Sequence, residues 1–214
     1  MNLPVLYPIL DTALLEARGF PVLDAADAML SAGAQILQWR CKAAVTRERF
    51  TELEAIARLC QRHAARFVIN DRADLAMMLG ADLHVGQTDM PAGIAREMIG
   101  NHLKLGLSTH GLDQLREADE LPVDYVAFGP VFPTTSKANP DPVVGLGLLR
   151  EMRRMTSKPL VAIGGITREN VQSVLDAGAD SVAVISDLIP EPCTRDGIRL
   201  RLAEWHEAIG VYAP

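Results

Sequence analysis

Aromatic residues are scarce in this sequence, at 5% of its 214 residues. Val, Ile, Leu, Ala and Met must therefore fill the core, as they do in parallel sheets covered by helices. The three cysteines fit neither a disulfide framework nor the spacing of a zinc site, so we expect free thiols. No run approaches the roughly 20 apolar residues of a membrane-spanning helix, and the N-terminus lacks the pattern of a secretory signal. These absences favour a cytoplasmic protein without a membrane partner.

Positive charge is also in short supply, because 21 Lys and Arg residues face 27 Asp and Glu residues, for a net charge of −6. A polyanion would be repelled on approach, so no nucleic-acid partner is expected. An anionic small molecule must instead meet a local cluster of basic residues. The length fits one domain, residues 1–214, and no change of composition marks a second one. Whether copies of the chain form a homo-oligomer is left open.

Short apolar runs alternate with longer amphipathic segments along the whole chain. This alternation is typical of βα units arranged around a parallel sheet. The expected strands are Val5–Leu10, Gln35–Arg40, Arg66–Ile69, Asp82–Val85, Lys104–Leu107, Tyr125–Phe128, Leu160–Ile163 and Ser181–Ile185. The expected helices are Asp24–Ala32, Thr46–Ala64, Ala73–Leu79, Ile94–Ile99, Leu112–Ala118, Leu146–Met155, Arg168–Ala177 and Asp196–Ile209.

A small motif recurs at three of the expected strands and fixes the phase of the units. Ala32-Gly33-Ala34 leads into the second strand, Gly80-Ala81-Asp82 into the fourth and Ala177-Gly178-Ala179-Asp180 into the eighth. Eight units without a break predict an α/β protein of the (β/α)8 TIM-barrel class. In such barrels the active site lies at the C-terminal ends of the strands. His84 lies within the fourth strand, and we expect it in the barrel interior.

Three polar residues alternate at the end of the second strand: Gln38, Arg40 and Lys42. Side chains two positions apart in a strand point to the same side, here into the mouth of the barrel. Arginine offers a bidentate fork and lysine a point charge to phosphate oxygens, so this row suits a diphosphate. The alternative is a solvated rim with surface ion pairs, which gives the inward-pointing side chains no ligand.

Two carboxylates, Asp71 and Asp89, follow the third and fourth strands. Because these strands are neighbours, the carboxylates can meet one hard cation. Mg²⁺ prefers oxygen ligands and keeps its other positions for water and substrate phosphates. The alternative is that each Asp caps the helix that follows it. The basic row on the second strand favours the magnesium site.

The last three βα loops carry features that suit a second phosphate. Gly164 and Gly165 follow the seventh strand and Ser186 follows the eighth, where many barrels bind phosphate through backbone N–H groups. A tight turn would explain the glycines without any ligand. The loop Gly129–Gly145 after the sixth strand is the longest irregular stretch. It adds three hydroxyls and a cation from Thr134, Thr135, Ser136 and Lys137.

Six motifs occur in order at successive strand ends. They are Gln-x-Arg-x-Lys from residue 38, Asn-Asp-Arg from 70, His-x-Gly-Gln-x-Asp from 84, Gly-x-Ser-x-His from 106, Gly-Pro-x-Phe-Pro-Thr-x-x-Lys from 129 and Ile-Gly-Gly-Ile from 163. With these motifs the chain resembles the thiamine-phosphate synthase family over nearly its whole length. The resemblance implies a Mg²⁺-dependent transferase. It would condense 4-amino-5-hydroxymethyl-2-methylpyrimidine diphosphate with a thiazole phosphate to give thiamine phosphate and diphosphate.

The resemblance also implies roles for individual residues. The pyrimidine diphosphate would be bound by Gln38, Arg40, Lys42, Asn70, Ser108 and Lys137, and Mg²⁺ by Asp71 and Asp89. The thiazole phosphate would be held by Thr134, Thr135, Ser136, Gly164, Gly165, Ile185 and Ser186. The catalytic groups around the departing diphosphate would be Arg40, Lys42, Ser108 and Lys137.

Three features depart from the family pattern: Cys41 replaces a common acidic residue, Gly111 follows His110 in place of Thr, and the segment Asp82–His84 is one residue short. The shortening would shift Asp89 and weaken the metal site. Two other activities stay open on the residues alone. A thiazole tautomerase would use a histidine such as His110 and needs no metal. A regulatory barrel would bind thiamine phosphate without turnover.

Overall fold

The computed structural model describes residues 3–134 and 141–210. Within them, eight parallel strands pair in chain order and close into a barrel, because β1 pairs with β8 as well as with β2. The strands are β1 (Leu6–Asp11), β2 (Ile36–Arg40), β3 (Arg66–Asn70), β4 (Asp82–Val85), β5 (Leu105–Thr109), β6 (Tyr125–Phe128), β7 (Leu160–Ile163) and β8 (Ser181–Val184). The (β/α)8 class predicted from the sequence is confirmed.

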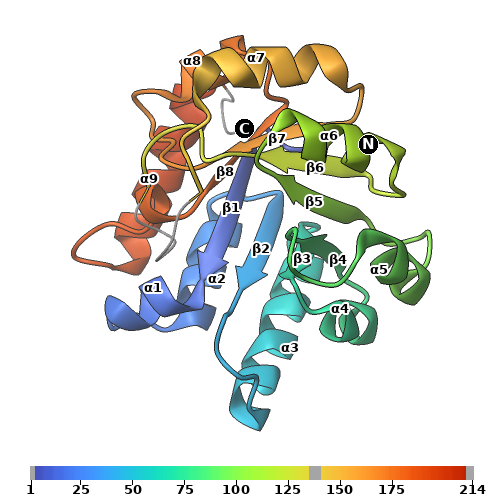
Figure 1. The fold of residues 1–214 in the computed structure, drawn as a ribbon. Coiled ribbons are helices and arrows are strands. Elements are labelled where there is room, and N and C mark those ends of the chain that lie inside the picture. Colours follow the sequence, from blue (N-terminus) through green and yellow to red (C-terminus); the bar gives the residue numbers. More distant parts are fainter. Residues whose placement is uncertain (1–2, 135–140, 211–214) are drawn as a thin grey trace.

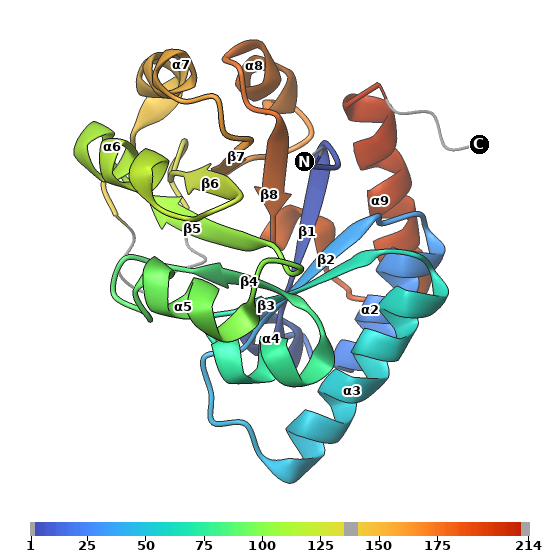
Figure 2. The ribbon, with the colours of Figure 1, turned by 90° about the vertical axis from the view of Figure 1, so that its right-hand side faces the viewer.

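Helices surround the strands as an outer layer (Figures 1 and 2). They are α1 (Thr12–Ala17), α2 (Val22–Ser31), α3 (Arg47–Arg62), α4 (Ala73–Leu79), α5 (Ala92–Ile99), α6 (Leu112–Glu120), α7 (Gly145–Met155), α8 (Val171–Asp176) and α9 (Arg195–Ala208), with a short 3-10 helix, η1 (Ser186–Leu188). The sequence did not predict α1 and η1, which are too short to display an apolar stripe. Among residues 3–134 and 141–210, no helix is long and apolar enough to cross a membrane.

Two separate apolar cores hold the barrel together. The outer core lies between strands and helices, where Leu10 and Trp39 meet helix residues such as Leu53 of α3. The inner core fills the barrel itself with Tyr7, Ile9, Ile36, Val68, Tyr125, Ala127, Val161 and Ala183. Alternate residues of a strand point to opposite faces, so six strands, all but β4 and β5, contribute to both cores.

The helix α3 shows how the sequence specifies one layer. Thr46 caps its first turn by accepting a hydrogen bond from the N–H of Arg49 at 3.3 Å. Leu53, Ile56 and Cys60 then recur at helical spacing and are buried against the barrel. The helix therefore forms where a cap and an apolar stripe coincide.

Gly106 shapes the barrel interior. A Cβ atom at this position would lie 2.1 Å from Cζ of Tyr125, which no side chain tolerates. The missing side chain on β5 thus makes room for the Tyr125 ring. That ring lies 6.2 Å from the Tyr7 ring and stacks on His84 with centroids 5.6 Å apart.

Three aspartates at the amino-terminal ends of the strands tie neighbouring strands together. Each carboxylate accepts a hydrogen bond from the backbone at the start of an adjacent strand. The pairs are Asp82 with Lys104 N–H at 2.7 Å, Asp124 with Leu105 N–H at 2.9 Å and Asp180 with Leu160 N–H at 2.8 Å. The Gly-Ala-Asp motifs at residues 80 and 178 therefore supply both the turn and the carboxylate that joins two strands.

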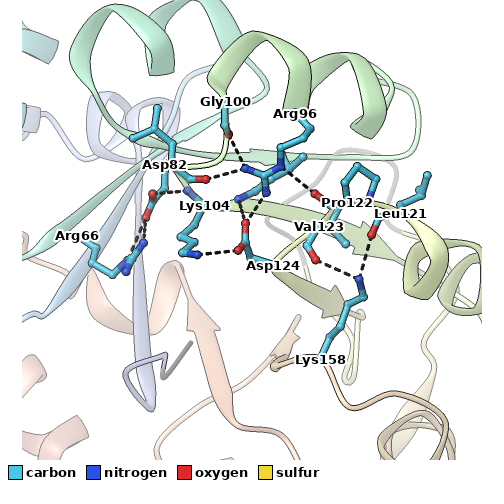
Figure 3. A network of polar contacts seen from close by, with 12 residues as sticks. Arg66, Asp82, Arg96, Gly100, Lys104, Leu121, Pro122, Val123, Asp124 and Lys158 are labelled. Carbon is cyan, nitrogen blue, oxygen red and sulfur yellow. Dashed lines mark hydrogen bonds and ion pairs between the residues drawn. The ribbon is translucent and has the colours of Figure 1, made fainter.

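Basic side chains complete this end of the barrel, which we call the lower end (Figure 3). Arg66 pairs with Asp82, and both Lys104 and Arg96 pair with Asp124. The cations also donate to backbone carbonyls: Arg96 to Gly100, Leu103 and Pro122, and Lys158 to Leu121 and Val123. The charged side chains at the lower end therefore form ion pairs with one another and hydrogen bonds with the backbone.

Candidate active site

A cavity of about 160 Å³ runs from the barrel interior to the loops at the carboxyl ends of the strands, the upper end. Nine residues predicted for the site line it: Gln38, Arg40, Asn70, Ser108, Thr134, Gly164, Gly165, Ile185 and Ser186. Lys42, Asp71 and Asp89 are not among the lining residues. Three further predicted residues, Thr135, Ser136 and Lys137, lie outside the residues that the structure describes.

Arg40 is held at the cavity by a residue that the sequence did not predict, Asp11. The Asp11 carboxylate, at the end of β1, pairs with the Arg40 guanidinium through Oδ2. Its Oδ1 accepts the Leu14 N–H at 2.9 Å and so caps α1. Asp11 is 5% exposed, and its two bonds fix it in place. The one signal in the sequence was an Asp in capping position before Thr12.

Lys42 lies just beyond β2 and pairs with Asp71. Its side chain is 54% exposed, so its ammonium group can exchange partners with solvent or a ligand. Asp71 has a φ of 66°, in the left-handed region that residues other than glycine rarely adopt. Such strain persists where the surrounding structure imposes it and is concentrated at functional sites.

Asp71 and Asp89 lie within hydrogen-bonding reach of each other, as predicted from their places after β3 and β4. Burial raises the pKa of Asp71, and the neighbouring Asp89 adds to this rise while Lys42 opposes it. Burial would also raise the pKa of Asp89, but hydrogen bonds from Asp71 and from the Gly86 N–H lower it below its ordinary value. The two carboxyl groups therefore compete for one proton, as close carboxylates do.

Neither aspartate caps a helix. The N-cap residue of α4 is Arg72 and that of α5 is Pro91, and neither makes a side-chain capping bond. The segment Asp82–His84, one residue short of the family pattern, forms most of β4. Asp89 still lies within hydrogen-bonding reach of Asp71. Within the described ranges, no three His, Cys, Asp or Glu residues converge as a metal site, so this pair supplies two carboxylates at most.

Asn70 ends β3 inside the cavity and carries an unsatisfied donor. Its side chain is buried, with the residue 7% exposed, and its Nδ2 has no hydrogen-bond partner among the described residues. A buried amide without a partner costs free energy. Its position in the cavity wall suits it to an acceptor on a bound ligand.

Gly164 and Gly165 have a structural reason of their own. Gly164 has a φ of 99°, and a Cβ on it would lie 2.4 Å from Cβ of Pro130. The loop after β6 lies directly on this turn, since the N–H of Phe132 donates to the carbonyl of Gly164 at 3.0 Å. The glycines thus let two loops of the cavity wall meet. Their binding of phosphate stays a prediction.

His110 lies in the cavity wall with a fixed tautomer. Its Nδ1 lies 2.6 Å from the carbonyl oxygen of Gly129, which can only accept, so Nδ1 carries the hydrogen. Its Nε2 faces the Asp141 carboxylate at 3.6 Å. Asp141, Tyr7 and Tyr125 also line the cavity, and the sequence prediction missed all three. The two tyrosines were hidden because they read as ordinary apolar strand positions.

Comparison with known proteins agrees with this geometry. Residues 6–188 match the family model described as thiamine monophosphate synthase. The chain belongs to this family. It is 46% identical to a thiamine-phosphate synthase of Koribacter versatilis over 91% of this chain and 93% of that protein. With a thiamine-phosphate synthase of Chlorobium phaeovibrioides the identity is 39% over 96% of both chains.

A solved structure supports the same assignment. The thiamine phosphate pyrophosphorylase from Pyrococcus furiosus superposes with a TM-score of 0.82 at 32% identity, over 96% of this chain and 95% of that one. The family makes the chain an enzyme, a transferase of thiamine biosynthesis acting on small molecules. The resemblance stated from the motifs is confirmed. The tautomerase and the regulatory barrel find no support among these relatives.

Proposed function

We propose that this protein condenses 4-amino-5-hydroxymethyl-2-methylpyrimidine diphosphate with a thiazole phosphate, giving thiamine phosphate and diphosphate. One observation carries the proposal. Arg40, in the wall of the cavity at the barrel mouth, pairs with Asp11, and Lys42, two residues further along the chain, pairs with Asp71, which lies within hydrogen-bonding reach of Asp89. Such a cluster can accept a diphosphate by exchanging carboxylate partners for phosphate oxygens.

The donor set fits Mg²⁺. Asp71 and Asp89 offer hard oxygen ligands, and the two carboxyl groups lie within hydrogen-bonding reach of each other. A pair of carboxylates leaves the remaining positions of the ion for water and phosphate oxygens. When bound there, Mg²⁺ would neutralise negative charge on the diphosphate as it leaves.

The residues of the chain would do the rest by binding and alignment. Arg40 and Lys42 would turn from their carboxylates to the diphosphate, and Asn70 would give its unpaired N–H₂ to the same substrate. Gln38 and Ser108 lie deeper in the cavity, where the pyrimidine ring would lie. Lys137 is proposed for the leaving diphosphate. The thiazole phosphate would be held by Thr134, Thr135, Ser136, Gly164, Gly165, Ile185 and Ser186.

The aminopyrimidine ring is electron-rich, so it can stabilise positive charge on its methylene carbon as the diphosphate departs. The thiazole nitrogen then bonds to that carbon. No protein nucleophile is needed, and rate enhancement would come from holding the two partners in line and from charge stabilisation.

The free thiols agree with the location that we propose, the cytoplasm. Cys41 and Cys60 are buried, Cys193 is partly buried, and all three are unpaired. Burial raises the pKa of the Cys60 thiol to about 12, which keeps it protonated and unreactive. Free cysteines are typical of proteins from a reducing compartment.

The direct test incubates the purified protein with both substrates and Mg²⁺ and assays thiamine phosphate and diphosphate. We expect equal amounts of both products, and none when either substrate or the metal is omitted. Isomerisation of the thiazole phosphate alone would contradict the proposal and indicate a tautomerase. Binding of thiamine phosphate without turnover would contradict it in favour of a regulatory barrel.

A further inference from the structure

A chain of hydrogen bonds crosses the barrel interior from Gln38 to Ser108. The Gln38 amide Nε2 donates to the Tyr7 hydroxyl at 3.1 Å, and the Tyr7 and Tyr125 hydroxyls are 2.9 Å apart. The Tyr125 hydroxyl lies 3.2 Å from His84 Nδ1, and His84 Nε2 lies 2.9 Å from Ser108 Oγ. Five strands, β2, β1, β6, β4 and β5, each contribute one member.

Most members of this hydrogen-bond chain are buried. Tyr7 and Tyr125 are each 1% exposed, Gln38 is 3% exposed and His84 is 7% exposed. Burial raises the pKa of both tyrosine hydroxyls far above the ordinary value, so each keeps its one proton. The space opened by Gly106 holds the Tyr125 ring against His84.

The direction of donation follows from counting hydrogens. A tyrosine hydroxyl has one hydrogen, so Tyr7, which accepts from Gln38, gives its own to Tyr125. Tyr125 then gives its hydrogen to His84 Nδ1, and because this nitrogen accepts, His84 carries its ring hydrogen on Nε2 and donates it to Ser108. If Tyr125 instead donated to Tyr7, the Tyr7 hydroxyl would accept from both Gln38 and Tyr125. Neither neighbour could then accept the hydrogen of the Tyr7 hydroxyl.

We propose that Tyr7, Tyr125 and His84 are positioning residues that set the hydrogen-bonding sense of Gln38 and Ser108 together. In this sense Gln38 keeps its carbonyl oxygen for the ligand, and Ser108 keeps its hydroxyl hydrogen. The cavity then offers one acceptor and one donor of fixed identity. If any link reverses, both ends reverse with it.

The acceptor at Gln38 and the donor at Ser108 would discriminate between pyrimidines that differ at position 4. This selectivity rests on the proposed function. A 4-aminopyrimidine presents an amino donor beside a ring-nitrogen acceptor, whereas its 4-oxo analogue presents an acceptor beside an N–H donor. A site with a fixed acceptor and a fixed donor forms two hydrogen bonds with the 4-aminopyrimidine. With the 4-oxo analogue it places acceptor against acceptor and donor against donor. The relay would thus select the amino-substituted ring through the fixed hydrogen-bonding sense of Gln38 and Ser108.

The relay is tested in the free protein by ¹⁵N NMR of the histidine tautomers at pH 8. We expect His84 as the Nε2–H tautomer in the wild type. Gln38→Glu places a carboxylate that can only accept, so Tyr7 must donate to it and His84 should become the Nδ1–H tautomer. Tyr7→Phe cuts the relay, and the double variant Gln38→Glu/Tyr7→Phe should return His84 to Nε2–H. His110, bonded through Nδ1 to the Gly129 carbonyl, is the internal reference and should stay Nδ1–H throughout.

Two results would overturn the relay: an Nδ1–H tautomer of His84 in the wild type, or an unchanged tautomer in folded Gln38→Glu. The wild-type spectrum alone decides the sense if that variant does not fold. Neither result depends on turnover, so they stand apart from any failure of the proposed reaction.

The functional arm compares kcat/KM for the 4-amino and 4-oxo pyrimidine diphosphates. We expect Tyr7→Phe and Tyr125→Phe to lower this preference by about tenfold while leaving KM for the thiazole phosphate unchanged. The matched control is Thr109→Val, which removes a fully buried hydroxyl outside the relay, bonded to the Ala127 carbonyl at 3.0 Å. An equal loss of preference in Thr109→Val, or none in either tyrosine variant, would contradict the selection role.

Discussion

The two ends of the barrel carry similar ion pairs that are built differently. At the lower end, Arg96 bonds to Asp124 and also to three backbone carbonyls (Figure 3). At the upper end, Arg40 and Lys42 bond, within the described part of the chain, to the carboxylates of Asp11 and Asp71 and to no backbone carbonyl. A cation anchored to carbonyls cannot leave them cheaply, whereas one paired with a carboxylate can exchange it for a phosphate.

The aspartates at the two ends have different hydrogen-bond partners. The lower-end aspartates satisfy the first N–H groups of neighbouring strands, so they serve the barrel itself. Among the described residues, the upper end holds Asp71 at a φ of 66° and an Asn70 amide without a partner, and the lower end likewise holds Ala64 at a φ of 52° and a Ser181 hydroxyl without a partner. We infer that charge stabilises the fold at the lower end and serves chemistry at the upper end, the division expected of TIM barrels.

The largest expected effect is a loss of stability when a cation of the lower end is removed. Arg96→Ala removes four donor contacts from a side chain that is 13% exposed and leaves Asp124 without one of its partners. We expect the free energy of unfolding to fall by about 3–5 kcal/mol. Urea denaturation measures this, with the exposed Arg116→Ala as control. A loss as small as the control's would contradict the role of the lower end. The activity of the molecules that remain folded should not change.

A smaller effect, on activity alone, is expected at the upper end. Arg40→Ala and Lys42→Ala should each lower kcat/KM for the pyrimidine diphosphate by roughly 10- to 150-fold, the equivalent of about 1.5–3 kcal/mol per charge-assisted contact. Steady-state kinetics with each substrate varied would show KM for the thiazole phosphate nearly unchanged. Equal weakening for both substrates would indicate general damage to the fold instead.

The smallest expected effect is the pH dependence of the stability that Asp124 contributes at the lower end. Burial raises the pKa of Asp124, but hydrogen bonds from Lys104, Leu105 and Arg96 outweigh it and hold this pKa below its ordinary value. A carboxylate of this kind stabilises the fold above the unfolded-state pKa of about 3.9 and loses that contribution as pH falls through the lowered folded-state value. Wild type should therefore exceed Asp124→Asn in unfolding free energy by about 1–2 kcal/mol at pH 7.

That difference should shrink below pH 4, which thermal or urea denaturation across a pH series would show. A difference that stays constant into acid would mean that Asp124 contributes through packing and not through its charge.

The fold was predictable because each strand is a short apolar run that stands out in the sequence. Short apolar runs, three of them preceded by a Gly-Ala motif, gave eight strands with ends within a residue or two of those observed. The six-residue α1 was not predicted because its only signal was the capping Asp11. The pairing of Asp11 with Arg40 was missed because this Asp was expected at most to cap a helix, although β1 and β2 are neighbouring strands.

The site was predictable where residues lie at strand ends and less so where they lie inside the barrel. Alternation along β2 placed Gln38 and Arg40 in the cavity, and adjacent strand ends brought Asp71 to Asp89. Tyr7 and Tyr125 come from β1 and β6, which are not neighbours, so only the closed barrel brings their hydroxyls together. Strand order alone does not give such a contact across the interior.

The most direct test of the account measures turnover against Mg²⁺ concentration for Asp71→Asn and Asp89→Asn, with the lower-end Asp124→Asn as the matched control and thermal melting as the check on folding. Asparagine keeps the size of the side chain and removes one negative ligand. We expect both upper-end variants to fold, to lose most of their turnover and to recover part of it at high Mg²⁺, while Asp124→Asn keeps the magnesium dependence of the wild type. An unchanged magnesium dependence in both upper-end variants would contradict a metal site at this pair of carboxylates and, with it, the division of roles between the two ends.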